Sequence, residues 1–123
     1  MEPQTLAELT LIVARMREAL DDPNEMERLD TAFHDRILAT ANGARLRRML
    51  SDLREELVTW RFLSLSTAQR RAATVAEHEA MLDALRAGAE ERVGLLTAAH
   101  IAAAQASVLA HVRRCPDPRA AAS

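Results

Sequence analysis

Apolar residues recur at helical spacing along almost the whole chain, and short polar breaks interrupt them at only a few points. Alanine and leucine supply 25 and 17 of the 123 residues, whereas only three residues are aromatic and none is tyrosine. Alanine, leucine, glutamate and arginine favour helices, and the β-branched and aromatic residues that favour strands are scarce. The pattern predicts an all-α protein and argues against an all-β or α/β fold.

The breaks divide the chain into five predicted helices. Pro23 lies in the first break, Asn42-Gly43 resembles a left-handed helix cap, Gly88 closes the fourth helix, and Pro116 follows the fifth. The predicted helices cover about residues 5–20, 25–41, 44–63, 69–87 and 90–114. Because the connections are short, we expect an antiparallel bundle of about five helices. Residues 1–114 should form one domain, with residues 115–123 as a flexible C-terminal tail.

Charge and cysteine content narrow the class of protein. The formal net charge is −2, and a nucleic-acid-binding module usually carries a clear basic excess. The single cysteine, Cys115, cannot form an internal disulfide, which favours an intracellular protein. Residues 93–110 are rich in alanine and weakly polar but include His100 and Gln105, so they predict a buried helix and not a membrane span. We therefore expect a cytoplasmic protein that does not contact a membrane.

Two polar residues fall on the apolar side of the second predicted helix. Asp30 and His34 are one helical turn apart and point the same way. They lie within the arc of apolar residues formed by Met26, Leu29, Phe33 and Ile37. A carboxylate and an imidazole facing a core are costly unless each finds a partner, which is either the other side chain or a divalent cation.

Two further histidines repeat this pattern. His78 shares a face with Met81, Leu82 and Leu85, and His100 shares one with Val93 and Leu96. Helix bundles build metal sites from facing helices, and three imidazoles with one carboxylate suit Zn, Ni, Cu, Mn or Fe(II). The alternative is that these histidines are hydrogen-bonded core residues, because periodicity does not show whether the three helices converge.

The remaining candidate residues have simpler interpretations. His111 is about 16 Å along its helix from His100, too far to share one metal ion. The arginine groups are interleaved with acidic residues, which predicts solvated helix faces. These groups are Arg45, Arg47 and Arg48; Arg70 and Arg71; and Arg113 and Arg114. An arginine such as Arg61, next to Trp60, could bind a carboxylate in a pocket.

Four sequence stretches, in order, resemble one known family. Asp30-Thr31-Ala32-Phe33-His34 reads as D-x-x-F-H, and residues 39–46, which read A-x-x-N-x-x-x-L, resemble an a-x-x-N-x-x-L turn with one more residue before the leucine. Residues 77–88 resemble an E-H-x-x-I-x-x-A-I-x-x-G helix, and His100 follows His78 by 22 residues. These motifs are similar to those of the FCD domain. It is the ligand-sensing C-terminal domain of the FadR subfamily of GntR-type transcriptional regulators.

The resemblance implies a metal site, an effector and an assembly. By analogy with the family, Asp30, His34, His78 and His100 would bind a divalent metal, zinc or nickel, inside the bundle. A small organic acid would bind on its open side, and the chain would form a homodimer. This sequence shows no N-terminal winged helix-turn-helix and begins about one helix later than the family. We therefore expect DNA contact only through such a domain, which this chain lacks.

The leading hypothesis is thus a metal-dependent sensing and dimerisation domain of a GntR-type regulator, which is not an enzyme. One alternative is a small metalloenzyme, but it requires a general base beside the metal. Glu77 and Glu79 are the nearest candidates by sequence, and both flank His78 and so point to other faces of the helix. A second alternative is a structural helical interaction module whose histidines are only packed and hydrogen-bonded.

Overall fold

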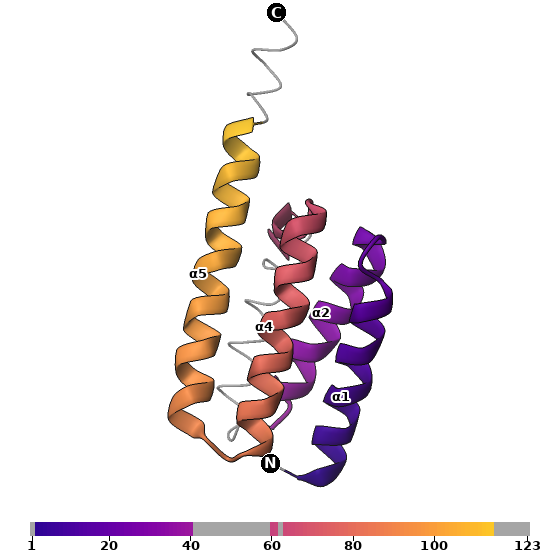
Figure 1. The fold of residues 1–123 in the computed structure, drawn as a ribbon, viewed down its shortest axis with the longest axis vertical. Coiled ribbons are helices and arrows are strands. Elements are labelled where there is room, and N and C mark those ends of the chain that lie inside the picture. The colour runs from indigo at the N-terminus through magenta and orange to yellow at the C-terminus, as the bar shows by residue number, and fades with distance from the viewer. Residues whose placement is uncertain (1, 41–59, 62, 115–123) are drawn as a thin grey trace, which may run out of the picture.

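The computed structural model describes residues 2–40, 60, 61 and 63–114 (Figure 1). It contains the helices α1 (Pro3–Glu18), α2 (Pro23–Leu38), α4 (Ala68–Arg86) and α5 (Glu90–Arg114), and no strand among these residues. The all-α prediction is confirmed, and four of the five predicted helices are present with ends within three residues of those expected. The predicted helix over 44–63 and the predicted tail over 115–123 lie mostly or wholly outside the described residues.

Local sequence signals set the helix ends. Pro23 occupies the first turn of α2, where its missing N–H costs nothing. The side chain of Asp22 accepts a hydrogen bond from the Glu25 amide at 3.2 Å, and Thr67 caps α4 in the same way. Gly88 follows α4 with φ +68°, a left-handed conformation that glycine adopts without steric cost. These caps fix where α2 and α4 start, and so which of their residues face inward.

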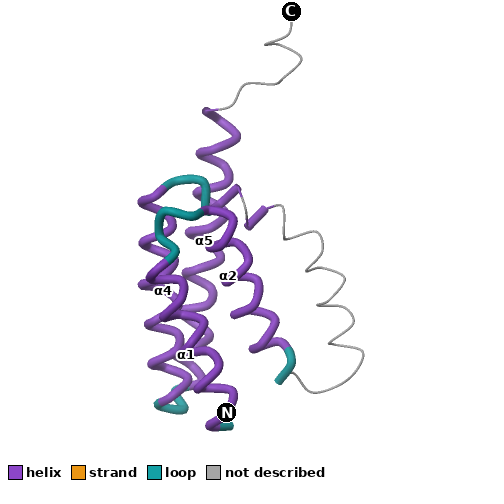
Figure 2. The backbone as a smooth tube through the Cα atoms, turned by 90° about the vertical axis from the view of Figure 1, so that its right-hand side faces the viewer, coloured by secondary structure: helices purple, strands orange, loops and turns teal. Residues whose placement is uncertain are grey.

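α1 and α2 run antiparallel, as do α4 and α5; α1 packs against both α2 and α4, and α4 also packs against α5 (Figures 1 and 2). Two clusters of buried apolar residues hold these helices together. The first cluster contains Met16, Ala19, Met26, Leu29, Leu65 and Val75. The second contains Leu9, Val13, Phe33, Met81 and Leu82. The second cluster joins α1, α2 and α4, and its Phe33 contacts His78. It therefore packs directly against the polar residues inside the bundle.

The prediction that residues 93–110 form a buried helix is wrong. In α5 only His100 and Val108 are buried, whereas Leu95, Ile101 and Leu109 are more than half exposed. By length and composition α5 could cross a membrane, yet it packs along α4 and buries a histidine there. The reason for the error is that an alanine-rich helix is weakly apolar on every side, so its sequence does not show which side packs.

Candidate metal centre

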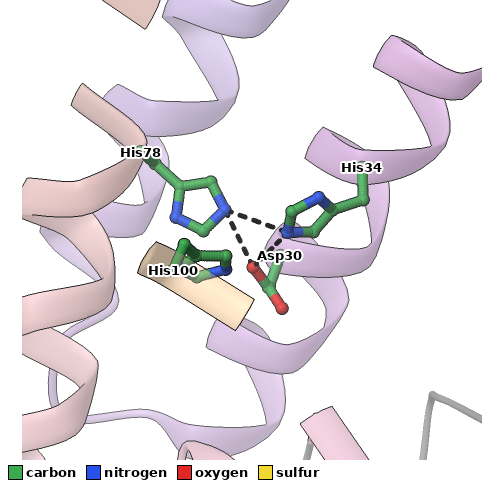
Figure 3. A group of neighbouring side chains, drawn as sticks. All are labelled: Asp30, His34, His78 and His100. Carbon is green, nitrogen blue, oxygen red and sulfur yellow. Dashed lines mark hydrogen bonds and ion pairs between the residues drawn. The ribbon is translucent and has the colours of Figure 1, made fainter. Parts of the chain in front are cut away.

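Four side chains from three helices meet near the centre of the bundle. Asp30 and His34 project from α2, His78 from α4 and His100 from α5 (Figure 3). Each offers one ligand atom, and these atoms all lie within 4.8 Å of one another. Asp30, His78 and His100 are buried, while His34 is partly exposed at the edge of the group. The structure thus brings together the four residues that the sequence placed on inward faces.

The spacing of three of these atoms matches the coordination shell of a transition metal. His78 Nε2 lies 2.9 Å from Asp30 Oδ1 and 3.3 Å from His34 Nε2, and His34 Nε2 lies 3.3 Å from Asp30 Oδ1. Ligands about 2.1 Å from a metal are separated by about 3.0 Å in octahedral and about 3.4 Å in tetrahedral geometry. The three atoms therefore already have the separations that one bound ion requires.

Hydrogen bonding supplies a second reason for a cation here. His78 Nδ1 lies 2.7 Å from the carbonyl oxygen of Thr74, which can only accept, so Nδ1 carries the proton. In the neutral ring, Nε2 then has only a lone pair, and it faces Asp30 Oδ1, a buried oxygen without a hydrogen-bond donor. Two lone pairs at 2.9 Å repel each other, so a proton or a cation must lie between them.

The charge states of two of these groups also favour cation binding. Burial raises the pKa of the Asp30 carboxyl, but the adjacent His34 and His78 lower it more, so its pKa lies well below the usual range. Burial and the neighbouring His78 lower the pKa of His100 to about 4. Near neutral pH Asp30 is therefore a carboxylate and His100 a neutral imidazole, which are the forms that bind metal ions.

A phenylalanine fixes two of the imidazole rings. Phe33 is fully buried, and its ring meets the ring of His78 edge-on at a centroid distance of 4.3 Å. It meets the ring of His34 in the same manner at 5.6 Å. These contacts restrict ring rotation on the side of the site away from solvent. The Phe33 of the D-x-x-F-H motif is thus a packing residue of the site.

A cavity of about 710 Å³ opens beside the four residues. Asp30, His34 and His100 form its polar end. Arg61 lies at the same end, with Nε 3.8 Å from Asp30 Oδ2 and Nη1 3.4 Å from Thr31 Oγ1. The other described lining is largely apolar and includes Trp60, Leu65, Ile101, Ala104, Val108 and Leu109. The volume is typical of a small-molecule site, and the charged groups gather at one end of it.

The prediction of solvated arginine faces is wrong for one of the three groups. Arg70 and Arg71 are buried. Arg71 donates to the carbonyl oxygens of Leu20 and Leu65 at 2.7 and 2.8 Å. Each guanidinium has several donors in one plane, so it can be buried when fixed acceptors surround it, and sequence spacing does not show those acceptors. Arg113 is exposed as expected, and Arg45, Arg47 and Arg48 lie outside the described residues.

Glu77 has a role that the sequence did not indicate. Both of its carboxylate oxygens accept hydrogen bonds from Arg70 at 2.7 Å, and Oε1 lies 2.6 Å from His100 Nδ1. Burial raises the pKa of Glu77, but Arg70 and His100 lower it more, which keeps it ionised. Glu79 points elsewhere and pairs with Arg17. Glu77 begins the E-H motif, but the sequence signal for its pairing is its spacing of seven residues from Arg70, which puts the two on one side of α4.

Comparison with known proteins agrees with the motifs. A family model described as the FCD domain matches residues 1–103, which is most of the chain. No curated protein and no solved structure matches the chain.

Proposed function

We propose that this chain, which belongs to the FCD domain family, senses a small organic acid through a bound divalent metal. The family is a regulatory, ligand-sensing one, which supports a role in a GntR-type transcriptional regulator. One observation carries the metal dependence: Asp30, His34 and His78 hold their ligand atoms at the spacing of a coordination shell, and Asp30 Oδ1 among them is buried without a hydrogen-bond partner. A site of this kind in the core is costly unless a cation fills it.

We assign the metal to Asp30, His34, His78 and His100. Three imidazole nitrogens and one carboxylate oxygen suit zinc or nickel. A bound metal would supply a Lewis-acidic centre with further positions for the oxygen atoms of a ligand. The chain's own residues bury the site from three sides, fix the His78 tautomer through Thr74, and leave His34 at the edge next to the cavity.

The cavity favours a carboxylate ligand. Arg61 is partly buried at its polar end, and its guanidinium can bind a carboxylate through two parallel N–H donors. Its distance of 3.8 Å from Asp30 is longer than a normal hydrogen bond, so the guanidinium is available to a ligand. An acid would thus place its carboxylate between Arg61 and the metal and its remaining atoms along Ile101 and Val108.

The expected assembly, location and DNA contact follow from the family and from the exposed apolar side chains of α5. We expect a homodimer in the cytoplasm, with DNA contact through a winged helix-turn-helix domain of the regulator. Exposed apolar side chains on α5, including Leu95 and Leu109, offer a surface for assembly. We expect no catalysis, because neither carboxylate that flanks His78 is available as a base: Glu77 binds Arg70 and His100, and Glu79 binds Arg17.

The test is a calorimetric titration of zinc-loaded and metal-free protein with small mono-, di- and hydroxycarboxylic acids. We expect at least one acid to bind the zinc-loaded wild type, and none to bind the metal-free protein or the Asp30→Ala variant. Asp83→Ala is the matched control, because Asp83 is exposed on α4 and should leave binding unchanged. Equal binding of an acid with and without metal would overturn the proposed mechanism.

A further inference from the structure

Two charged groups, linked in a chain, lie behind His100. Arg70 is buried on α4 and binds Glu77 with a two-pronged contact, Nη1 to Oε2 and Nη2 to Oε1, each at 2.7 Å. Glu77 Oε1 in turn lies 2.6 Å from Nδ1 of His100 on α5. The first contact lies within α4, and the second joins α4 to α5.

The contact between Glu77 and His100 fixes where the imidazole proton lies. An ionised carboxylate can only accept a hydrogen bond, so Nδ1 of His100 must donate and carry the proton. The neutral ring then keeps a free lone pair on Nε2, the nitrogen that remains for a metal ion. The same logic applies to His78, whose Nδ1 donates to the carbonyl of Thr74.

Arg70 alone would favour the opposite tautomer. Its Nη2 lies 3.5 Å from His100 Nδ1, and a guanidinium can only donate. Without Glu77, Nδ1 would accept from Arg70, the proton would move to Nε2, and that nitrogen could not bind a cation. Glu77 therefore decides between two tautomers of His100, only one of which can bind a metal.

We infer that Glu77 is a positioning residue of the metal site, which holds His100 in its metal-binding tautomer, and that Arg70 holds Glu77 in place. This inference rests on the proposed function. A carboxylate that accepts the second N–H of a metal-binding histidine makes the ring a stronger ligand, and its loss typically lowers metal affinity 10–100-fold. Arg70 contributes by orienting both oxygens of Glu77 and by keeping the carboxylate ionised.

The first test compares zinc affinities, measured by competition with a chromophoric chelator. We expect Glu77→Gln and Glu77→Ala to lower the affinity by about 10–100-fold. Glutamine has the shape of glutamate, but it is neutral, and its NH2 group would replace the oxygen that accepts from Arg70 Nη1, so it cannot bind Arg70 and His100 together as the carboxylate does. A role limited to packing would leave Glu77→Gln at wild-type affinity, which would overturn the inference. The matched control is Glu79→Gln on the same helix, which should bind zinc like the wild type.

A double-mutant cycle tests whether the effect passes through His100. In a His100→Ala background, Glu77→Gln should change zinc affinity by less than about twofold, because the positioned ring is absent. An equal loss in both backgrounds would show that Glu77 acts on the fold in general and would contradict the inference. The visible absorption spectrum of the cobalt-loaded protein should change with Glu77→Gln and stay unchanged with Glu79→Gln.

A measurement on the wild type needs no variant to fold. Nitrogen-15 spectra of histidine-labelled, metal-free protein at neutral pH distinguish a protonated Nδ1 from a protonated Nε2. We expect His100 to carry its proton on Nδ1, and a proton on Nε2 would overturn the inference. If the wild type failed to bind zinc while His100 had the expected tautomer, the proposed function would fail and the positioning by Glu77 would stand.

Discussion

Removing the metal should lower the melting temperature of the protein by a predictable amount. The four ligand side chains come from α2, α4 and α5, so the site exists only in the folded bundle and binding stabilises that state. At a free zinc concentration 1,000 times the dissociation constant, this linkage contributes about 4.1 kcal/mol. Unfolding a chain of 123 residues carries an entropy of about 0.26 kcal/mol/K, so chelation should lower the melting temperature by about 16 °C.

The assay is thermal unfolding followed by circular dichroism, with zinc at that excess and again after EDTA. Asp30→Ala should melt at the same temperature with and without zinc. The variant lacks Asp30 Oδ1, the carboxylate oxygen that lies next to Nε2 of both His34 and His78. The exposed Asp83→Ala variant should show the full wild-type shift. A wild-type melting temperature unaffected by zinc at this excess would refute the argument that the three helices share one ion.

Three further predictions concern the same region. Arg61→Ala should weaken acid binding to the zinc-loaded protein without changing zinc affinity, as measured by calorimetry; an unchanged acid affinity would remove Arg61 from the site. Phe33→Ala should lower the free energy of unfolding by about 3–5 kcal/mol in urea titrations of the metal-free protein, because a fully buried ring is lost. Acid should destabilise the metal-free protein between about pH 6.5 and 4. The pKa of His100 is about 4 in the folded state and about 6.5 in the unfolded state. As the pH falls through this range, only the unfolded chain binds the proton, and this binding favours unfolding. Denaturation at a series of pH values should show this loss, and His100→Gln should reduce its slope.

The helices and the four inward polar residues could be predicted because both follow from local rules. Single residues mark the helix ends. Proline lacks an N–H donor (Pro23), the capping side chains accept a backbone N–H (Asp22 and Thr67), and glycine favours a left-handed backbone (Gly88). A period of 3.6 residues then assigns each side chain to a face. A polar residue on an apolar helix face can be recognised from the sequence, because the free-energy cost of burying it there depends on that face alone.

Other features could not be predicted because they depend on contacts between helices. Whether His34, His78 and His100 converge depends on how α2, α4 and α5 pack, which periodicity does not encode. Arg70 and Arg71 resemble surface residues until their acceptors are placed around them. Glu77 is adjacent to His78 and was assigned to another face of α4, yet that face meets α5 and His100. Apart from the pairing of Arg70 with Glu77 within α4, each error thus concerned a partner supplied by a different element.

Metal content tests the central claim most directly. Untagged wild-type protein, purified without chelator and dialysed against metal-free buffer, should retain about one equivalent of zinc or nickel per chain by elemental analysis. The double variant Asp30→Ala, His78→Ala, prepared in parallel, should retain none, while Asp83→Ala should match the wild type. Wild-type protein that holds no metal, and takes up none when zinc and nickel are added back, would contradict the account.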